Sequence, residues 1–176
     1  MLSLEDVLSV ARATEIKKKE IRAPEALNDP IEYGSAFSRG IRVELNDIVI
    51  LFISGTASVD EHGRSVHVGD FRAQCRRTFY NITKLLEAEG ATWKDVVRTT
   101  CYLRDIEQHY QVFNEERTRF YREQGLDPFP ASTGIEAKLC RPELLVEIEA
   151  IAIFKKRPQQ EQAQRGHEEQ APTQGR

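Results

Sequence analysis

Two glutamates, Glu147 and Glu149, stand in a strongly apolar segment, Leu144–Phe154. Residues two apart in a β-strand point to the same side, so an extended conformation places both carboxylates side by side among aliphatic neighbours. Burying a carboxylate is costly unless it is hydrogen-bonded, paired, or protonated through a raised pKa. Glu147 is therefore predicted to be either an acid/base group in a reaction or a structural group bonded to Arg, Tyr or backbone across a subunit interface. For Glu149 the structural role is favoured.

A cysteine and an arginine precede this strand. Cys140 and Arg141 occupy a predicted turn between the last two strands, which places Arg141 near Glu147 at the end of one hairpin. A guanidinium makes two parallel hydrogen bonds to a carboxylate, so Arg141 is a candidate clamp for a carboxylate-bearing ligand. The alternative is an ion pair with Glu143 or Glu147. Cys140 is either a reactive thiol or, as is more common for a lone cysteine, a small core residue.

Small and hydroxyl-bearing residues form a second candidate binding segment. Ser54, Gly55 and Thr56 end a predicted strand, where a glycine allows a ligand to approach the backbone closely. The segment lacks the elbow pattern of serine hydrolases and the lysine and glycine spacing of a phosphate-binding loop. The 4 histidines show no metal-ligand spacing, and we expect no metal and no other cofactor.

The elements that must position these residues form one predicted α+β domain. Apolar patterns and turn signals predict strands at Ser38–Leu45, Ile48–Ser54, Val96–Leu103, Ser132–Leu139 and Leu144–Phe154. Capping aspartates and terminal glycines predict one helix between Asp70 and Gly90 and a second between Asp105 and Gly125. The apolar side of the first helix is predicted to consist of Phe71, Cys75, Phe79, Ile82, Leu85 and Leu86. The order ββαβαββ provides two helices, which can cover only one face of a mixed sheet of five or six strands.

The two ends of the chain differ from this domain. Residues 1–35 are predicted to form an N-terminal arm with a short helix beginning near Ser3, and residues 36–156 form the domain itself. Residues 157–176 are rich in Gln, Glu, Arg, Pro and Gly, with alanine as their apolar content. Such a composition cannot offset the entropy of ordering, so a disordered tail is predicted.

Bulk composition argues against several classes of function. The net charge of -3 and the lack of a basic cluster in the domain make a nucleic-acid partner unexpected. The longest apolar stretch, Ile48–Ile53, is too short to cross a bilayer, so no membrane partner is expected. Glu5 and Asp6 lie where a signal peptide would be apolar, so we expect no export. The 3 cysteines show no CxxC spacing and fit a reducing compartment, so the expected location is cytoplasmic.

The predicted sheet has one face without a cover. Ile48–Ile53 and Leu144–Phe154 carry apolar residues on both faces, whereas both predicted helices lie on the same face. An exposed apolar surface of this extent usually marks an interface, so we expect a homo-oligomer. The alternative is that the N-terminal arm covers the second face.

Four segments taken together resemble the Rid/YjgF family, also called L-PSP endoribonuclease-like proteins. They are Ala36–Gly40, Phe52–Gly55, Val96–Asp105 and, with the greatest weight, Val146–Ala152. The resemblance implies a chorismate-mutase-like fold, a homotrimer whose sheets form a central barrel, and three small-molecule clefts between neighbouring subunits. It also implies that Asn114 and Glu147 occupy pocket positions.

Members of the best-known subgroup hydrolyse enamines and imines such as 2-aminoacrylate, and they hold the substrate carboxylate with an arginine. The resemblance puts that arginine at Ser132, and it puts the family's usual tyrosine at Phe37. This chain is therefore expected to be a small-molecule hydrolase or lyase that is not of the standard arginine-dependent type. The alternatives are a deaminase in which Arg39 or Arg141 replaces the missing arginine, and a non-catalytic metabolite-binding or regulatory trimer.

A second likeness joins the two candidate segments. Ile53–Ser58 and Cys140–Glu149 look like the catalytic half of chorismatases, which remove pyruvate from chorismate. The likeness implies that Glu147 is a general acid, with Cys140 and Arg141 shaping the pocket. Chorismatases carry a second Rid-like half, whereas this chain supplies one.

Overall fold

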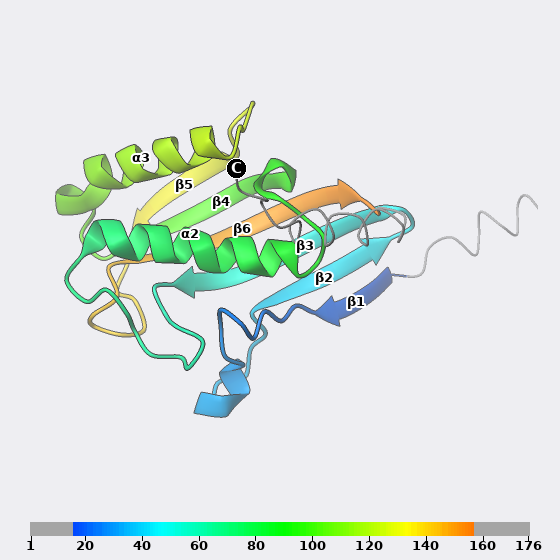
Figure 1. Cartoon of the computed structure of the whole chain (residues 1–176), viewed down its shortest axis with the longest axis horizontal. Coiled ribbons are helices and arrows are strands. Elements are labelled where there is room, and N and C mark those ends of the chain that lie inside the picture. Colours follow the sequence, from blue (N-terminus) through cyan, green and yellow to red (C-terminus); the bar gives the residue numbers. More distant parts are fainter. Residues whose placement is uncertain (1–15, 157–176) are drawn as a thin grey trace, which may run out of the picture.

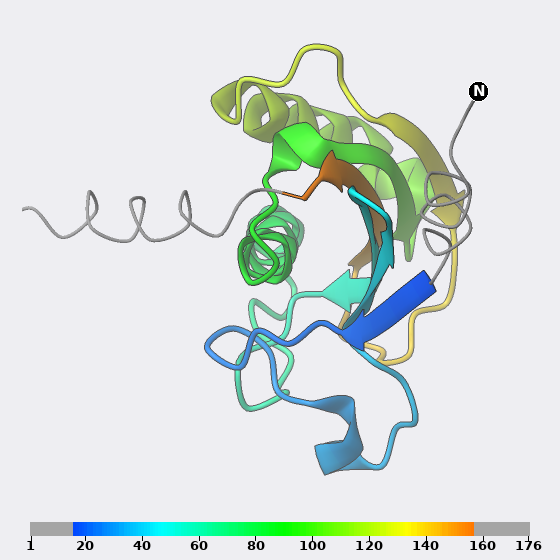
Figure 2. The ribbon, with the colours of Figure 1, turned by 90° about the vertical axis from the view of Figure 1, so that its right-hand side faces the viewer.

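The computed structural model describes residues 16–156 of the 176-residue chain. Its strands are β1 (Ile16–Glu20), β2 (Gly40–Leu45), β3 (Ile48–Ala57), β4 (Val96–Leu103), β5 (Ala131–Glu136) and β6 (Val146–Lys155). Its helices are α2 (Phe71–Glu87) and α3 (Ile106–Glu123), with short 3-10 turns η1 (Pro30–Tyr33) and η2 (Trp93–Asp95). The strands form one mixed sheet that curves with both helices on the same side (Figures 1 and 2). The predicted α+β class is confirmed.

The helix predicted near Ser3 and the tail predicted for residues 157–176 lie outside the described residues. Within residues 16–156, neither helix combines the length and the apolar character needed to cross a membrane.

Each long helix begins at the aspartate predicted to cap it. The Asp70 carboxylate accepts a hydrogen bond from the Ala73 backbone N–H at 2.9 Å. Asp105 accepts an equivalent bond from Gln108 at 2.9 Å. These bonds satisfy backbone donors that the start of a helix leaves without an intrahelical partner. The predicted apolar side of α2 is buried against the sheet, and it consists of Phe71, Cys75, Phe79, Ile82, Leu85 and Leu86.

The last two strands do not form the predicted hairpin. β6 lies between β3 and β4 and is antiparallel to both, whereas β5 pairs in parallel with β4 at the edge of the sheet. The physical reason lies in the apolar content of the two strands. Alternate residues of β6 are buried, but every residue of β5 is exposed, so the more apolar strand occupies the centre.

A strand that the sequence did not predict, β1, forms the opposite edge of the sheet. It pairs antiparallel with β2, from Ile16 opposite Leu45 to Glu20 opposite Ile41. Its three consecutive lysines gave no apolar alternation from which a strand could be predicted. Lysine is well suited to an edge strand, because its charge discourages pairing with another chain. Residues 16–20, predicted as part of the arm, therefore belong to the sheet.

The alternation predicted for β6 is confirmed and defines the two faces of the sheet. Val146, Ile148, Ala150 and Ala152 are buried toward the helices. The opposite face, here called the uncovered face, carries Phe52 of β3 together with Glu147, Glu149, Ile151 and Ile153 of β6. Phe52 is 45% exposed and Ile153 is 42% exposed, so within residues 16–156 this apolar face lies open to solvent.

Candidate functional site

Glu147 lies on the uncovered face directly beside Gly55 of β3. A methyl group built on Gly55 would lie 2.1 Å from Glu147 Oε1 and 3.0 Å from its carboxyl carbon. The carboxylate therefore occupies the space that a side chain at position 55 would need. An irregularity in the pairing of β3 with β6, between Ile53 and Thr56, brings Gly55 to this position. Two residues predicted separately from sequence are thus brought together.

The surroundings of Glu147 favour its protonated form. Burial raises the pKa of Glu147, and the neighbouring Glu149 carboxylate raises it further. In the part of the chain that the structure describes, no cation offsets these two effects. Glu149 has a partner within the same chain, because the Tyr102 hydroxyl donates to Glu149 Oε2 at 3.1 Å. A carboxyl group with a raised pKa can hold a proton and transfer it to a bound molecule.

The Arg141 guanidinium is bonded to a loop of its own chain. It donates to the Gly63 carbonyl at 2.7 Å and to Ser65 Oγ at 3.2 Å, and it lies 5.9 Å from the centre of the Tyr33 ring. Within residues 16–156 it forms no ion pair with Glu147. The prediction that Arg141 lies near Glu147 depended on a hairpin between the last two strands, and that hairpin does not form.

A neighbouring arginine that the sequence analysis missed holds the segment before β6. Arg104 donates to the backbone carbonyl of Leu144 at 2.6 Å and to that of Leu139 at 3.3 Å. Cys140, within this segment, is exposed, so the interpretation of Cys140 as a small core residue is wrong. The other two cysteines, Cys75 and Cys101, are the buried ones.

Arg39 is buried between two aromatic rings. Its Nε and Nη2 groups donate to the backbone carbonyl and the side-chain oxygen of Asn28, each at 3.0 Å. Its guanidinium lies 5.7 Å from the centre of the Tyr33 ring and 5.5 Å from that of Phe37. The guanidinium of Arg39 is already hydrogen-bonded to Asn28 of its own chain. Its role in this structure is therefore to stabilise the positions of Tyr33 and Phe37, and ligand binding by Arg39 is disfavoured.

The hydroxyls of the predicted small-residue segment are bonded to the backbone. Ser54 Oγ donates to the Ser38 carbonyl at 2.7 Å, and Thr56 Oγ1 donates to the Ser54 carbonyl at 2.8 Å. Thr56 is also buried. Of the three predicted residues, Gly55 is therefore the one that adjoins the Glu147 carboxylate.

Asn114 and Ser132 are joined by a residue that the sequence analysis did not single out, Arg117. Arg117 of α3 donates to Ser132 Oγ at 2.8 Å and to Asn114 Oδ1 at 2.6 Å. Ser132 also accepts a hydrogen bond at 3.1 Å from buried Thr99, its register partner on β4. Residues three apart in a helix share a face, so the spacing of Asn114 and Arg117 was a signal that could have identified this arginine.

These residues lie on the opposite side of the sheet from Glu147. Ser132 shares its face with Thr99, which is buried under the helices, whereas Glu147 lies on the uncovered face. Glu147 belongs to β6 and Ser132 to β5, and β4 lies between these two strands. One chain therefore does not bring Glu147 and Ser132 to the same ligand.

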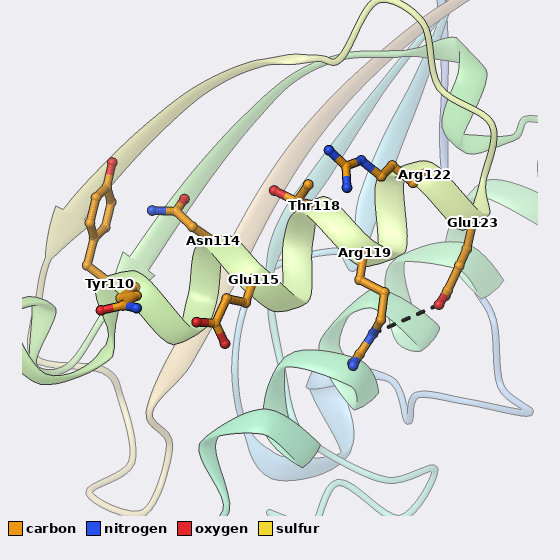
Figure 3. Close-up of a pocket in the computed structure, with 8 residues that line it drawn as sticks. Tyr110, Asn114, Glu115, Thr118, Arg119, Arg122 and Glu123 are labelled. Carbon is orange, nitrogen blue, oxygen red and sulfur yellow. Dashed lines mark ion pairs between the residues drawn. The ribbon is translucent and has the colours of Figure 1, made fainter.

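A hollow of about 860 Å³ runs along α3 (Figure 3). Its described lining residues all come from this helix: Tyr110, Gln111, Asn114, Glu115, Thr118, Arg119, Arg122 and Glu123. Figure 3 shows Tyr110 and Asn114 on one side of the helix, and an ion pair of 3.9 Å between Arg119 and Glu123 on the other. Because one helix supplies the whole described wall, these residues enclose a ligand on one side only.

The arrangement is that of an α+β protein with a protonatable carboxyl group on one face of its sheet. The sequence pattern of the family described as Endoribonuclease L-PSP matches residues 30–154. The chain belongs to this family, the Rid/YjgF superfamily.

Relatives and solved structures agree with this assignment. The chain is 33% identical over 102 residues to a RutC family protein of Pyrococcus horikoshii, covering 58% of this chain and 77% of that protein. It is 32% identical over 103 residues to the 3-aminoacrylate deaminase RutC of Acinetobacter baylyi, covering 58% and 78%. The crystal structure of the YjgF gene product of E. coli superposes with a TM-score of 0.64 at 27% identity, covering 78% of this chain and 99% of that one.

Proposed function

We propose that this chain is a Rid-type hydrolase that deaminates a small carboxylate-bearing enamine or imine, with Glu147 as the acid/base group. The observation that carries the proposal is the position of Glu147, a partly buried carboxyl group beside Gly55 whose pKa is raised and which no described cation neutralises. The 32% identity to a 3-aminoacrylate deaminase supports the same chemistry.

The reaction needs a group that can both give and take a proton. Protonated Glu147 donates to the enamine carbon and generates the imine, after which its carboxylate takes a proton from the attacking water. A new C–O bond forms, and Glu147 passes the proton from water to nitrogen. The C–N bond then breaks and ammonia leaves, while the added hydroxyl gives its proton to the Glu147 carboxylate and becomes the carbonyl, which restores protonated Glu147. The product is a keto or aldehyde acid. A chorismatase-like lyase has less support, because Arg141 is bonded to Gly63 and Ser65 of its own chain.

The direct test is release of keto acid from 2-aminoacrylate generated in the assay by another enzyme. We expect product to form faster than in the buffer alone, in proportion to the concentration of this protein. Because 2-aminoacrylate also hydrolyses unaided, the background rate is subtracted. A rate equal to that background at high protein concentration would contradict the proposal and favour a non-catalytic metabolite-binding trimer.

We further propose that three copies assemble in a chorismate-mutase-like arrangement, with their uncovered faces forming a central barrel and the ligand clefts between neighbours. Two observations support this. The uncovered face exposes aromatic and aliphatic side chains that water solvates poorly. In addition, Glu147 and Ser132 lie on opposite sides of one sheet, so a cleft that uses both must take one of them from a second copy.

Replacing Phe52 with glutamate is expected to dissociate the assembly. The change puts a charge at the centre of the uncovered face, opposite Ile151 on β6. Sedimentation velocity should then show a smaller species than the wild-type protein. Val68→Glu is the matched control, because Val68 is 66% exposed but belongs to no strand. The same mass for both variants and the wild-type protein would contradict the proposed interface.

Replacing Gly55 with alanine is expected to reduce turnover while leaving the fold intact. The added methyl group would overlap Glu147 Oε1, so the carboxylate must move. Because a displacement of about 1 Å can cost about 10²-fold in rate, we expect kcat to fall by roughly that factor. Gly134→Ala on β5 is the control, since a methyl group there meets the Tyr110 ring at 3.6 Å, an ordinary contact. Similar kcat values for the two variants would count against this placement of Glu147.

A further inference from the structure

We propose that Arg117 of α3 binds the substrate carboxylate, at an anion site that it forms with Asn114 and Ser132. The inference rests on the proposed function and assigns a residue to it that neither the composition nor the family resemblance indicated. Three features of the structure carry it: the charge around Arg117, the direction of its hydrogen bonds, and its position next to Ser132.

Arg117 is a cation whose described neighbours are neutral. Its two hydrogen bonds go to a hydroxyl and an amide oxygen, and its guanidinium lies 5.1 Å from the centre of the Phe113 ring. Two ionisable groups near Arg117 stay neutral, because burial raises the pKa of the Cys101 thiol and raises that of Tyr121 to about 12. A partly buried cation among neutral groups keeps a strong attraction for an anionic ligand.

The arginines that link α3 to α2 have different surroundings. Arg72 and Arg76 of α2 and Arg119 of α3 all form ion pairs with Glu116. Their charge is therefore compensated within the chain. Arg117, in contrast, donates its hydrogen bonds to the neutral oxygens of Ser132 and Asn114, which distinguishes it from these structural arginines.

The hydrogen bonds of Arg117 leave donors available for a ligand. A guanidinium carries five N–H groups, and two of them are used for Ser132 and Asn114. The Asn114 side chain accepts from Arg117 through its oxygen, so its NH₂ group remains a donor. Asn114 also lines the hollow along α3, on the side shown with Tyr110 in Figure 3. A carboxylate there would meet a guanidinium and an amide, both of which are donors.

The position of Arg117 also accounts for a serine at position 132. A short side chain at this point of β5 leaves space, and the guanidinium of Arg117 approaches the Ser132 hydroxyl to 2.8 Å. A positive charge is thus present beside β5, although it comes from the helix and not from the strand. We infer that the ligand is a small molecule with one carboxylate, because a single planar fork matches a single planar anion.

The test is an NMR titration of the full-length protein with pyruvate and with its uncharged amide, pyruvamide. We expect Arg117→Ala to weaken pyruvate binding by about 30- to 100-fold, the effect of losing a charge-assisted hydrogen-bonded pair, and to change pyruvamide binding by less than about 2-fold. Arg117→Lys should recover part of the affinity, because it restores the charge without the planar fork. Arg98→Ala is the matched control, because Arg98 also donates a hydrogen bond to β5, at Thr133 Oγ1. We expect the Arg98→Ala variant to bind both probes with the affinity of the wild-type protein.

Each outcome of the titration separates a ligand role from a structural one. Equal weakening of pyruvate and pyruvamide, accompanied by a lower melting temperature, would show that Arg117 only docks α3 on β5 and would overturn the proposal. Failure of the wild-type protein to bind pyruvate would also overturn it.

The proposed function is tested separately. A protein that binds pyruvate through Arg117 but does not hydrolyse 2-aminoacrylate would refute the deaminase and leave the anion site standing. An active enzyme whose KM for 2-aminoacrylate is unchanged in Arg117→Ala would refute the site and leave the function standing.

Discussion

Replacing Glu147 with glutamine is expected to lower kcat for 2-aminoacrylate hydrolysis by about 10²- to 10⁴-fold, the usual contribution of a general acid/base. Glutamine keeps the size of the side chain beside Gly55 but cannot give or take the proton. Steady-state kinetics, with circular dichroism to verify the fold, measures the effect. Unchanged kcat would rule out Glu147 as the acid/base group.

The pH dependence of the wild-type enzyme gives a second measure of the same group. Burial and Glu149 raise the pKa of Glu147, so its protonated form persists above the ordinary carboxyl range. A step that needs this proton should slow as pH rises through the raised pKa, and Glu147→Gln should abolish that dependence. Glu149→Gln is the control: it removes the neighbouring charge, so the falling limb of the pH profile should move to lower pH while turnover is kept.

The raised pKa of Glu147 also predicts how the free energy of unfolding depends on pH. A carboxyl group whose pKa is higher in the folded than in the unfolded state stabilises the fold at low pH and loses that contribution as pH rises through the folded value. At neutral pH the ionised Glu147 is therefore a cost to the fold. Glu147→Gln should raise the free energy of unfolding relative to the wild-type protein at neutral pH, and this difference should shrink on acidification.

Replacing Glu116 with glutamine is expected to cause a loss of about 2–3 kcal/mol in the free energy of unfolding. The Glu116 side chain is 1% exposed and accepts hydrogen bonds from Arg72 at 2.7 Å, from Arg76 at 3.1 Å and from Arg119. Breaking a fully buried ion pair costs about 3–5 kcal/mol. The expected value is lower because the three arginines are 43%, 60% and 51% exposed, and solvent screens them. Urea denaturation monitored by circular dichroism measures the loss.

The neighbouring residue on α3 provides the control for this variant. Glu115 pairs with Arg72 at 2.6 Å but its side chain is 49% exposed, so Glu115→Gln should change stability by less than about 0.5 kcal/mol. Equal losses for the two variants would show that burial of Glu116 does not matter.

The lowered pKa of Glu116 also predicts how the free energy of unfolding changes at acid pH. Burial opposes the ionisation of Glu116, but hydrogen bonds from Arg72 and Arg76 outweigh it and hold the pKa of Glu116 below its usual range. The stabilisation is therefore present at pH values above the ordinary carboxyl pKa and is lost as pH falls through the lowered value. The stability difference between wild type and Glu116→Gln should disappear in acid, whereas a constant difference would contradict this origin.

The sequence by itself determined the features that depend on neighbours along the chain. The caps at Asp70 and Asp105 and the apolar side of α2 were predicted because helix starts and helix faces are set within a few residues. The alternation of β6 likewise placed Glu147 and Glu149 on the same face of the strand. The uncovered apolar face followed from the same patterns.

Only the tertiary structure decided which distant segments lie side by side. The insertion of β6 between β3 and β4 separated Arg141 from Glu147, and the same order placed β5 at an edge. The strand β1 was not predicted, because its lysines show no alternation of apolar and polar residues. Its hydrogen bonds with β2 stabilise it instead. Arg117 reaches Ser132 across fifteen positions of sequence, because a long side chain on α3 can contact any strand packed beneath that helix. The sequence spacing cannot show which strand lies beneath α3, because the pairing of remote backbone segments determines the strand order.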